Sequence, residues 1–165
     1  MKKQRITLIL GGNQGNVLQT LDLALAKIKK QLGVVSKQSK LYTTEAWGNI
    51  PQPDFFNLVI ELKTIKTPKQ TLDIILKIEK QLGRERKERY GPRTIDIDIL
   101  YYENRIISLN NLTIPHPEIQ NRRFVLVPLN EINPKQKHPV LKQKNSYLLE
   151  KTSDKGQVKT WKTRN

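Results

Sequence analysis

Residues 94–100 read T-I-D-I-D-I-L, in which isoleucines alternate with aspartates. Successive side chains of a β-strand point to opposite faces, so this alternation predicts a strand with one apolar and one acidic face. Asp96 and Asp98 then share a face, about 7 Å apart along the strand. Two carboxylates at that spacing repel each other, which leaves two interpretations open: a solvated polar face, or a site for divalent cations. The poor strand propensity of aspartate weighs against the first.

Regular patterns continue on the N-terminal side of this stretch. Apolar residues at spacings of three and four predict a helix over residues 17–32 with Asn16 as its N-cap. Thr67-Pro68 predicts the start of a second helix, which should end at Gly83. Residues 43–54 are rich in glycine and proline and should form a loop. Strands are expected over residues 6–10, 34–41 and 58–62.

On the C-terminal side, the strand over residues 95–102 is predicted to turn at Glu103-Asn104 and pair with residues 105–107 as a hairpin. Alternating strands and helices predict a mixed α and β fold. The length of 165 residues favours one domain, residues 1–165, with a Lys-rich C-terminal tail from about residue 136. Further elements are expected near residues 118–130 (helix), 147–149 (helix) and 158–161 (edge strand).

The composition excludes several classes of site. The chain has no cysteine, which rules out a disulfide framework and a thiolate metal site. The first apolar run is too short for a signal peptide, and no stretch approaches the roughly 20 apolar residues of a membrane span. The G-G-N-Q-G-N turn matches neither the Walker A nor the Rossmann glycine pattern. We therefore expect a cytoplasmic protein that does not bind membranes.

The charge is strongly basic, with 30 Lys and Arg against 15 Asp and Glu. Such a balance indicates a nucleic acid or a phosphorylated small molecule as partner, although lysines spread over the whole chain also fit a general compositional bias. One cluster stands out: G-R-E-R-K-E-R-Y-G-P-R, residues 83–93, leads directly into the acidic strand. Arginine binds phosphate oxygens bidentately, so this junction predicts a clamp of metal ion and triphosphate. A solvated charge run and a nucleic-acid patch are the alternatives.

Glu79 interrupts an apolar helix face. At 100° per residue, it falls among Leu72, Ile75, Leu76 and Leu82. A carboxylate there is costly unless it is paired, so it should reach a cation or an arginine. If the helix instead ends before it, Glu79 is solvated.

Two loops carry further candidates. His116 lies between prolines, close in sequence to Arg122 and Arg123. Its side chain is either structural or a hydrogen-bond donor to phosphate. Trp47, Phe55 and Phe56 flank or belong to the segment Q-P-D-F-F-N. These aromatic side chains either join the core or enclose a flat heterocycle beside Asn57.

Taken together, the motifs resemble the 6-hydroxymethyl-7,8-dihydropterin pyrophosphokinase family. The resemblance is strongest in R-Y-G-P-R-T-I-D-I-D-I-L, residues 89–100. It extends over residues 10–16, 44–57, 78–84 and 114–129, in the expected order, and covers the chain to about residue 134. The Lys-rich tail lies beyond it.

The resemblance implies an α+β fold, a ferredoxin-like α/β sandwich with a mainly antiparallel sheet flanked by helices. It also implies a folate-pathway reaction, in which the β,γ-diphosphate of ATP is transferred to the hydroxymethyl group of 6-hydroxymethyl-7,8-dihydropterin and AMP is released. Two Mg²⁺ ions would assist. The expected partners are these two small molecules, and we expect a monomer that binds no nucleic acid.

The resemblance also implies roles for residues at matching positions. The metal ligands would be Asp96 and Asp98, and the catalytic set would add Arg84 and Arg93. The ATP-binding residues would be Glu79, Arg84, Arg86, Lys87, Arg93, His116 and Arg122. The pterin would be bound by Thr44, Trp47, Phe55, Asn57 and Phe124, with Phe55 and Phe124 flanking the ring and Asn57 contacting its amide edge.

Four positions depart from the family pattern. Gly12 stands where serine is usual, which we expect to affect only the turn. Tyr90, Leu76 and Asn111 replace Trp, Gln and Arg of some members, which leaves individual lid and adenine contacts open.

The alternative function is a nucleic-acid-binding module of ferredoxin-like fold, which would show exposed aromatic and basic residues on an open sheet face. A phosphohydrolase or sugar transferase with paired aspartates is a second alternative, but neither needs the aromatic loop.

Overall fold

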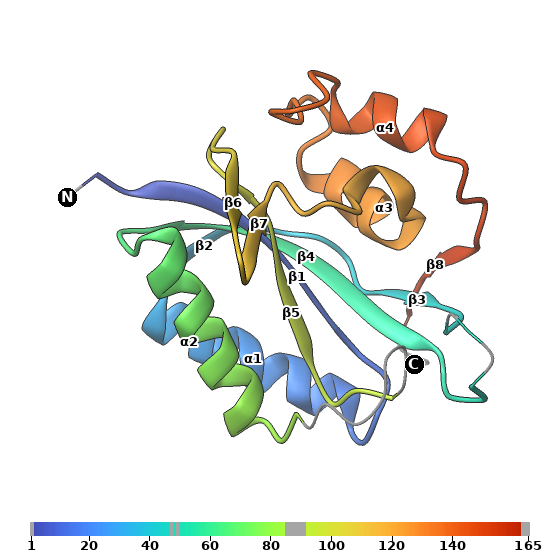
Figure 1. The fold of residues 1–165 in the computed structure, drawn as a ribbon. Helices are drawn as coiled ribbons and strands as arrows, with labels where there is room; N and C mark the ends of the chain where they lie inside the picture. The colour runs from blue at the N-terminus through green and yellow to red at the C-terminus, as the bar shows by residue number, and fades with distance from the viewer. Residues whose placement is uncertain (1, 47, 49, 85–91, 163–165) are drawn as a thin grey trace.

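The computed structural model describes residues 2–46, 48, 50–84 and 92–162. Within them, one antiparallel sheet of six strands forms the centre of the molecule, in the order β5-β1-β4-β3-β8, and β2 also pairs with β4 (Figure 1). The sheet contains β1 (Gln4–Gly12), β2 (Gly33–Gln38), β3 (Tyr42–Thr44), β4 (Phe55–Thr64), β5 (Asp96–Tyr102) and β8 (Val158–Thr160).

Helices cover both faces of this sheet (Figure 1). On one face, α1 (Val17–Gln31) and α2 (Pro68–Gln81) pack over a core that includes Leu8, Ile60 and Ile97. On the other, a 3₁₀ turn, η1 (Ile119–Asn121), precedes α3 (Arg123–Ile132), and α3 and α4 (Asn145–Lys151) pack over a second, smaller core. The predicted mixed fold with a mainly antiparallel sheet is confirmed.

Local capping explains where the two long helices begin and end. The side chain of Asn16 accepts a hydrogen bond from the amide of Gln19, as predicted for the N-cap of α1. Thr67 and Gln70 form a reciprocal capping box at the start of α2. Gly83 ends that helix with a φ of 86°, which favours glycine.

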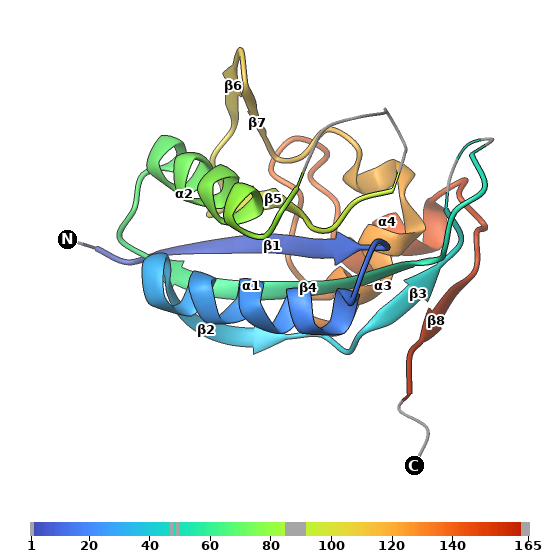
Figure 2. The same cartoon turned by 90° about the horizontal axis from the view of Figure 1, so that it is seen from below.

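The predicted hairpin between β5 and residues 105–107 is wrong. The hairpin instead joins β6 (Ile107–Leu109) to β7 (Leu112–Ile114) and stands away from the main sheet (Figure 2). Its two-residue turn is Asn110-Asn111, and asparagine is a residue type common in turns.

The predicted loop over residues 43–54 is too long at its start, because Tyr42–Thr44 forms β3 and pairs with β4. The expected position of Leu76 on the buried face of α2 is also wrong, since this side chain is 40% exposed.

The Lys-rich C-terminal segment contributes to the folded structure. Leu148 of α4 is buried in the second core, and Asn145 accepts a hydrogen bond from the hydroxyl of Tyr101. The predicted edge strand near residues 158–161 is confirmed as β8, and it pairs with β3. In the described part of the chain, no helix combines the length and the apolar character that crossing a membrane requires.

Candidate functional site

The strand register brings side chains from distant parts of the chain into two rows. Gly11 of β1 lies opposite Asp96 of β5 on one side and Asn57 of β4 on the other. In the next row, Ile9 lies opposite Asp98. Because neighbouring strands are about 4.8 Å apart, the Asp96 and Asn57 positions are separated by roughly 10 Å across the sheet.

The predicted alternation in β5 is confirmed. The isoleucines at positions 95, 97 and 99 are buried in the core beneath α1 and α2. Asp96 and Asp98 therefore project from the opposite face, where they border a pocket.

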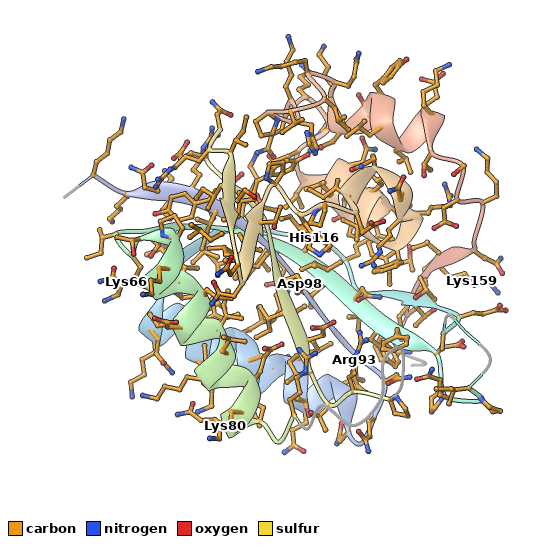
Figure 3. The ribbon with its side chains drawn as sticks, in the orientation of Figure 1. Lys66, Lys80, Arg93, Asp98, His116 and Lys159 are labelled. Carbon is orange, nitrogen blue, oxygen red and sulfur yellow. The ribbon has the colours of Figure 1, made fainter. Side chains whose placement is uncertain are left out.

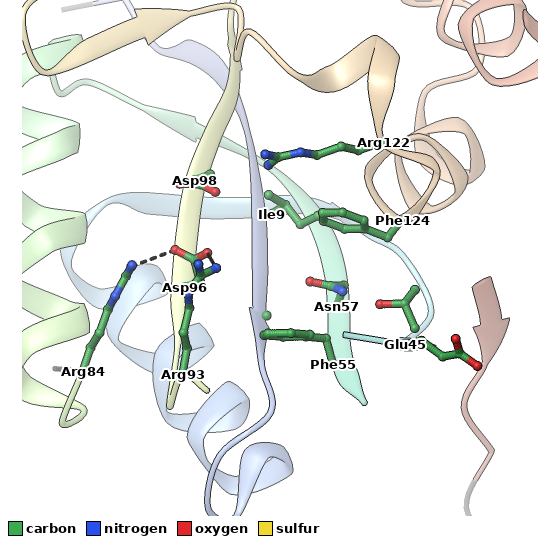
Figure 4. Close-up of a pocket in the computed structure, with 12 residues that line it drawn as sticks. Ile9, Glu45, Phe55, Asn57, Arg84, Arg93, Asp96, Asp98, Arg122 and Phe124 are labelled. Atoms are coloured by element: carbon green, nitrogen blue, oxygen red, sulfur yellow. Dashed lines mark hydrogen bonds and ion pairs between the residues drawn. The ribbon is translucent and has the colours of Figure 1, made fainter. Parts of the chain in front are cut away.

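This pocket has a volume of about 290 Å³ and two chemically different ends (Figure 4). One end carries aspartates and arginines, and the other carries aromatic rings and an asparagine. Its lining consists of Ile9, Gly11, Thr44, Glu45, Phe55, Asn57, Arg84, Arg93, Asp96, Asp98, Arg122 and Phe124.

Gly11 keeps the centre of the pocket floor open. A Cβ atom on this residue would lie 2.1 Å from Oδ1 of Asn57 and 2.8 Å from the carbonyl oxygen of Phe56. No side chain fits there without displacing Asn57. The backbone of Gly12 is similarly close to the next segment, since its Cβ would lie 2.6 Å from the carbonyl oxygen of Thr94. The expectation that Gly12 affects only its turn is therefore wrong.

At the charged end, Asp96 accepts hydrogen bonds from two arginines. Its Oδ1 lies 2.7 Å from Nη1 of Arg84, and its Oδ2 lies 3.0 Å from Nη1 of Arg93. Arg84 also pairs with Glu79, which is 3% exposed. Of the two interpretations of Glu79, the paired one is confirmed.

Glu79 links this cluster to the backbone of β5. Its Oε2 accepts a hydrogen bond of 2.9 Å from the amide of Ile97, between the two aspartates. Burial raises the pKa of Glu79, although the Ile97 amide and Arg84 act in the opposite direction. Asp96 and Glu79 together raise the pKa of Arg84 against the effect of its burial.

Asp98, at the charged end, and His116 lie close together (Figure 3). Nε2 of His116 lies 4.0 Å from Oδ2 of Asp98. Nδ1 of His116 accepts a hydrogen bond from the amide of Glu118, so in the neutral ring the proton is on Nε2, facing Asp98. Desolvation, with the nearby charges of Asp96 and Glu79, raises the pKa of Asp98 to about 7.

The other end of the pocket is aromatic. Phe55 and Phe124 lie on opposite sides of Asn57 in Figure 4. The guanidinium of Arg122 lies 5.9 Å from the ring centre of Phe124. Phe56, by contrast, packs against the core and against Trp161 at 5.9 Å between ring centres. The two interpretations of the aromatic loop thus apply to different residues: Phe56 joins the core, while Phe55 borders the pocket.

The structure brings together most of the candidates from the sequence. Glu79 and His116 are not among the lining residues, but each lies beside one of them, Arg84 and Asp98 respectively. Trp47, Arg86 and Lys87 lie outside the described residues. The sequence analysis missed Ile9, Gly11 and Glu45. Side chains alternate between the two faces of β1, so Ile9 and Gly11 share a face. That pattern could have identified them as pocket residues only if the pairing of β1 with β5 had been known.

The charged end fits Mg²⁺ together with phosphate. No group of three or more His, Asp or Glu side chains suited to a metal ion occurs among the described residues. Mg²⁺ is commonly held by one or two carboxylates plus substrate phosphates, and Asp96 and Asp98 supply that number. Arg84 has a buried Nε–H without a hydrogen-bond partner in the described part of the chain, which leaves one donor for an anion.

Comparisons with known proteins agree with this chemistry. The model of the family described as 7,8-dihydro-6-hydroxymethylpterin-pyrophosphokinase (HPPK) matches residues 7–134. A 2-amino-4-hydroxy-6-hydroxymethyldihydropteridine pyrophosphokinase from Synechocystis sp. is 44% identical over 126 residues, which are 76% of this chain and 64% of that protein. The protein of the same name from Aquifex aeolicus is 38% identical over 134 residues, 81% of this chain and 83% of that one.

Solved structures show the same fold. The wild-type HPPK-DHPS protein of Plasmodium falciparum superposes with a TM-score of 0.73 at 20% identity, over 91% of this chain and 45% of that chain. The chain thus spans less than half of that protein and less than two thirds of the Synechocystis relative. Because the family model covers most of the chain, including every described lining residue of the pocket, the chain belongs to the 7,8-dihydro-6-hydroxymethylpterin-pyrophosphokinase family.

Proposed function

We propose that this chain transfers diphosphate from ATP to 6-hydroxymethyl-7,8-dihydropterin in folate biosynthesis. The hydroxymethyl oxygen attacks the β-phosphorus of ATP, and the bond from that phosphorus to the α,β-bridging oxygen breaks. The products are the pterin diphosphate, AMP and one proton, which the hydroxyl loses.

A single feature carries this proposal beyond family membership: the pocket joins an arginine–aspartate end to an aromatic–amide end. The roughly 10 Å between the Asp96 and Asn57 positions leaves room for a flat ring at one end and phosphates at the other. A simple phosphohydrolase would need only the charged end.

At the charged end, the proposed work is positional and electrostatic, because phosphoryl transfer requires little covalent chemistry from the protein. Asp96 and Asp98 would hold Mg²⁺, with two ions proposed. Bound there, Mg²⁺ would neutralise charge on the phosphates and favour ionisation of the attacking hydroxyl. When Asp96 is so engaged, Arg84 and Arg93 can turn from its oxygens to those of the triphosphate.

Three other residues support the nucleotide in this proposal. His116 would direct its Nε2–H toward phosphate oxygens, and Arg122 would add positive charge above the pocket. Glu79 would act through Arg84, since it is buried behind that side chain. Arg86 and Lys87 remain proposed ATP contacts.

At the other end, the pterin would lie between Phe55 and Phe124, with Asn57 bonded to its polar edge. Offset stacking on aromatic rings stabilises flat heterocycles. Thr44, at the end of β3 beside Phe55, would complete that edge. Trp47 remains a proposed neighbour of the ring.

A product assay tests the proposal. Purified protein is incubated with ATP, Mg²⁺ and the dihydropterin, and the nucleotides are separated by chromatography. AMP should appear in equal amount to the pterin diphosphate and should be lost when Mg²⁺ is chelated. Formation of ADP or free phosphate in place of AMP would refute the proposal.

We further propose that the chain works in the cytoplasm as a monomer and binds no nucleic acid. The part of the second sheet face that α3 leaves open carries Asp96 and Asp98, two carboxylates that a nucleic-acid-binding module would leave unexplained. A gel shift with mixed RNA at physiological salt tests the alternative function, and size-exclusion chromatography tests the oligomeric state.

A further inference from the structure

Asn13, in the turn after β1, is a buried side chain that the proposed chemistry does not use. It is 4% exposed, and its amide group makes hydrogen bonds in two directions. Nδ2 donates to Oε1 of Gln52 and to the carbonyl oxygen of Pro53, both at 2.9 Å. Oδ1 accepts from the backbone amide of Arg93, also at 2.9 Å.

The two partners of Asn13 lead to opposite ends of the pocket. Pro53 lies two residues before Phe55, which borders the aromatic end. Arg93 binds Asp96 at the charged end. The main chain strengthens the second connection, since the amides of Asn13 and Gln14 both donate to the carbonyl oxygen of Arg93.

An amide group is planar, so its acceptor and its donors keep a fixed relative orientation. A displacement of the segment around Pro53 therefore changes the orientation of the acceptor that holds the Arg93 backbone. The Asn13 side chain is itself buried, although Pro53 lies at the surface, so breaking either bond leaves a buried amide atom that must find another partner. Asn13 thus joins the two pocket ends mechanically as well as filling its turn.

On this basis, we propose that Asn13 is a positioning residue that couples the two substrate sites, an inference that rests on the proposed diphosphate transfer. Ordering of the 51–57 segment by the pterin stabilises the Arg93 backbone in the position that meets the triphosphate. By linkage, nucleotide binding then strengthens pterin binding by the same factor. Couplings of this kind are typically about 5- to 150-fold.

The test compares pterin affinity with and without nucleotide. The nucleotide is α,β-methylene ATP with Mg²⁺, in which the bond that must break is blocked. The ratio of the two dissociation constants measures the coupling, and single-turnover rates with ATP measure the alignment. For the wild type, we expect a ratio of at least about 5.

Two variants separate the hydrogen bonds made by Nδ2 of Asn13 from the one made by its Oδ1. In Asn13→Ala both sets are lost, so the ratio of dissociation constants should fall to about 1. The single-turnover rate should drop about 100-fold, as for a misplaced reacting group. Asn13→Asp keeps the acceptor for the Arg93 amide but loses both donors toward Gln52 and Pro53. It should retain most of the rate while the ratio falls, and it serves in place of Asn13→Ala if that variant does not fold.

Asn16→Ala is the matched control. Asn16 lies in the same turn, but among the described residues its side chain accepts only from the amide of Gln19, at the start of α1. Its loss should lower the unfolding temperature and leave both the ratio and the rate unchanged.

The inference is overturned if Asn13→Ala lowers stability but keeps the wild-type ratio, which would make Asn13 purely structural. A wild-type ratio of 1 would overturn it as well, while AMP formation by the wild type would leave the proposed function standing. Absence of AMP in the wild type would instead refute the proposed function, and with it this inference.

Discussion

Substituting Gly11 by alanine tests whether the centre of the pocket floor must remain open. The new Cβ would lie 2.1 Å from Oδ1 of Asn57. An ordinary contact between carbon and oxygen is about 3.3 Å, so the amide must move by about 1.2 Å. The nearby carbonyl oxygen of Phe56 belongs to the backbone and cannot rotate away.

This displacement sets the size of the expected effects. Overpacking of this kind costs about 1–3 kcal/mol of folding free energy. Moving Asn57 out of register would remove the hydrogen bonds proposed between it and the pterin and leave buried polar groups unpaired, at about 1–3 kcal/mol. The dissociation constant of the pterin should therefore rise about 5- to 150-fold.

Calorimetric titration of the pterin into the protein bound to α,β-methylene ATP and Mg²⁺ measures this change in the dissociation constant. Gly15→Ala is the control: Gly15 has a φ of 73°, so alanine is strained there, but nothing lies within 4 Å of its Cβ. It should cost about 1–2 kcal/mol of stability and leave pterin affinity within about twofold. In an Asn57→Ala background, Gly11→Ala should weaken binding no further. A folded Gly11→Ala protein that binds the pterin like the wild type would refute the reasoning.

Three further predictions concern charged and titrating groups. Arg93→Ala should lower the turnover rate about 10³-fold in a product assay while the protein stays folded; near-normal turnover would contradict its place in the clamp. Asp98→Asn should abolish turnover at ordinary Mg²⁺, whereas the exposed Asp73→Asn should not, as a Mg²⁺ titration of the rate would show. Burial lowers the pKa of His138, whose Nδ1 accepts hydrogen bonds from two backbone amides. The unfolded chain therefore takes up the proton first, and stability should fall as the pH drops below 6.5. His138→Asn keeps an acceptor without titrating, so denaturant melts of this variant should show a shallower decline of stability with falling pH than melts of the wild type. His116 is present in both proteins and cancels in the comparison, and parallel declines would contradict the assignment.

Local patterns in the sequence predicted the features that depend on neighbouring residues. Capping by Asn16 and Thr67 follows from side chains that reach amides three residues away. The two faces of β5 follow from strict alternation. The failed hairpin after β5 shows the limit of such signals, because Glu103-Asn104 and Asn110-Asn111 are both plausible turns and only pairing energies choose between them.

The parts of the site that depend on strand register could not be predicted. Gly11 looks like a tight corner in the sequence, and only its position between Asp96 and Asn57 shows that it opens a pocket. Asn13 contacts residues 39 and 80 positions away, a separation that no local pattern encodes. The burial of Glu79 was predictable from the helix period, but its bond to the Ile97 amide was not.

Following two phosphorus labels tests the central claim most directly. ATP labelled at the β-phosphorus and ATP labelled at the γ-phosphorus are supplied in separate reactions with Mg²⁺ and the dihydropterin. Diphosphate transfer predicts that both labels enter the pterin product in equal yield and that neither remains with the nucleotide released. Entry of the γ label alone, with the β label retained in ADP, would contradict the claim and indicate a monophosphate kinase instead.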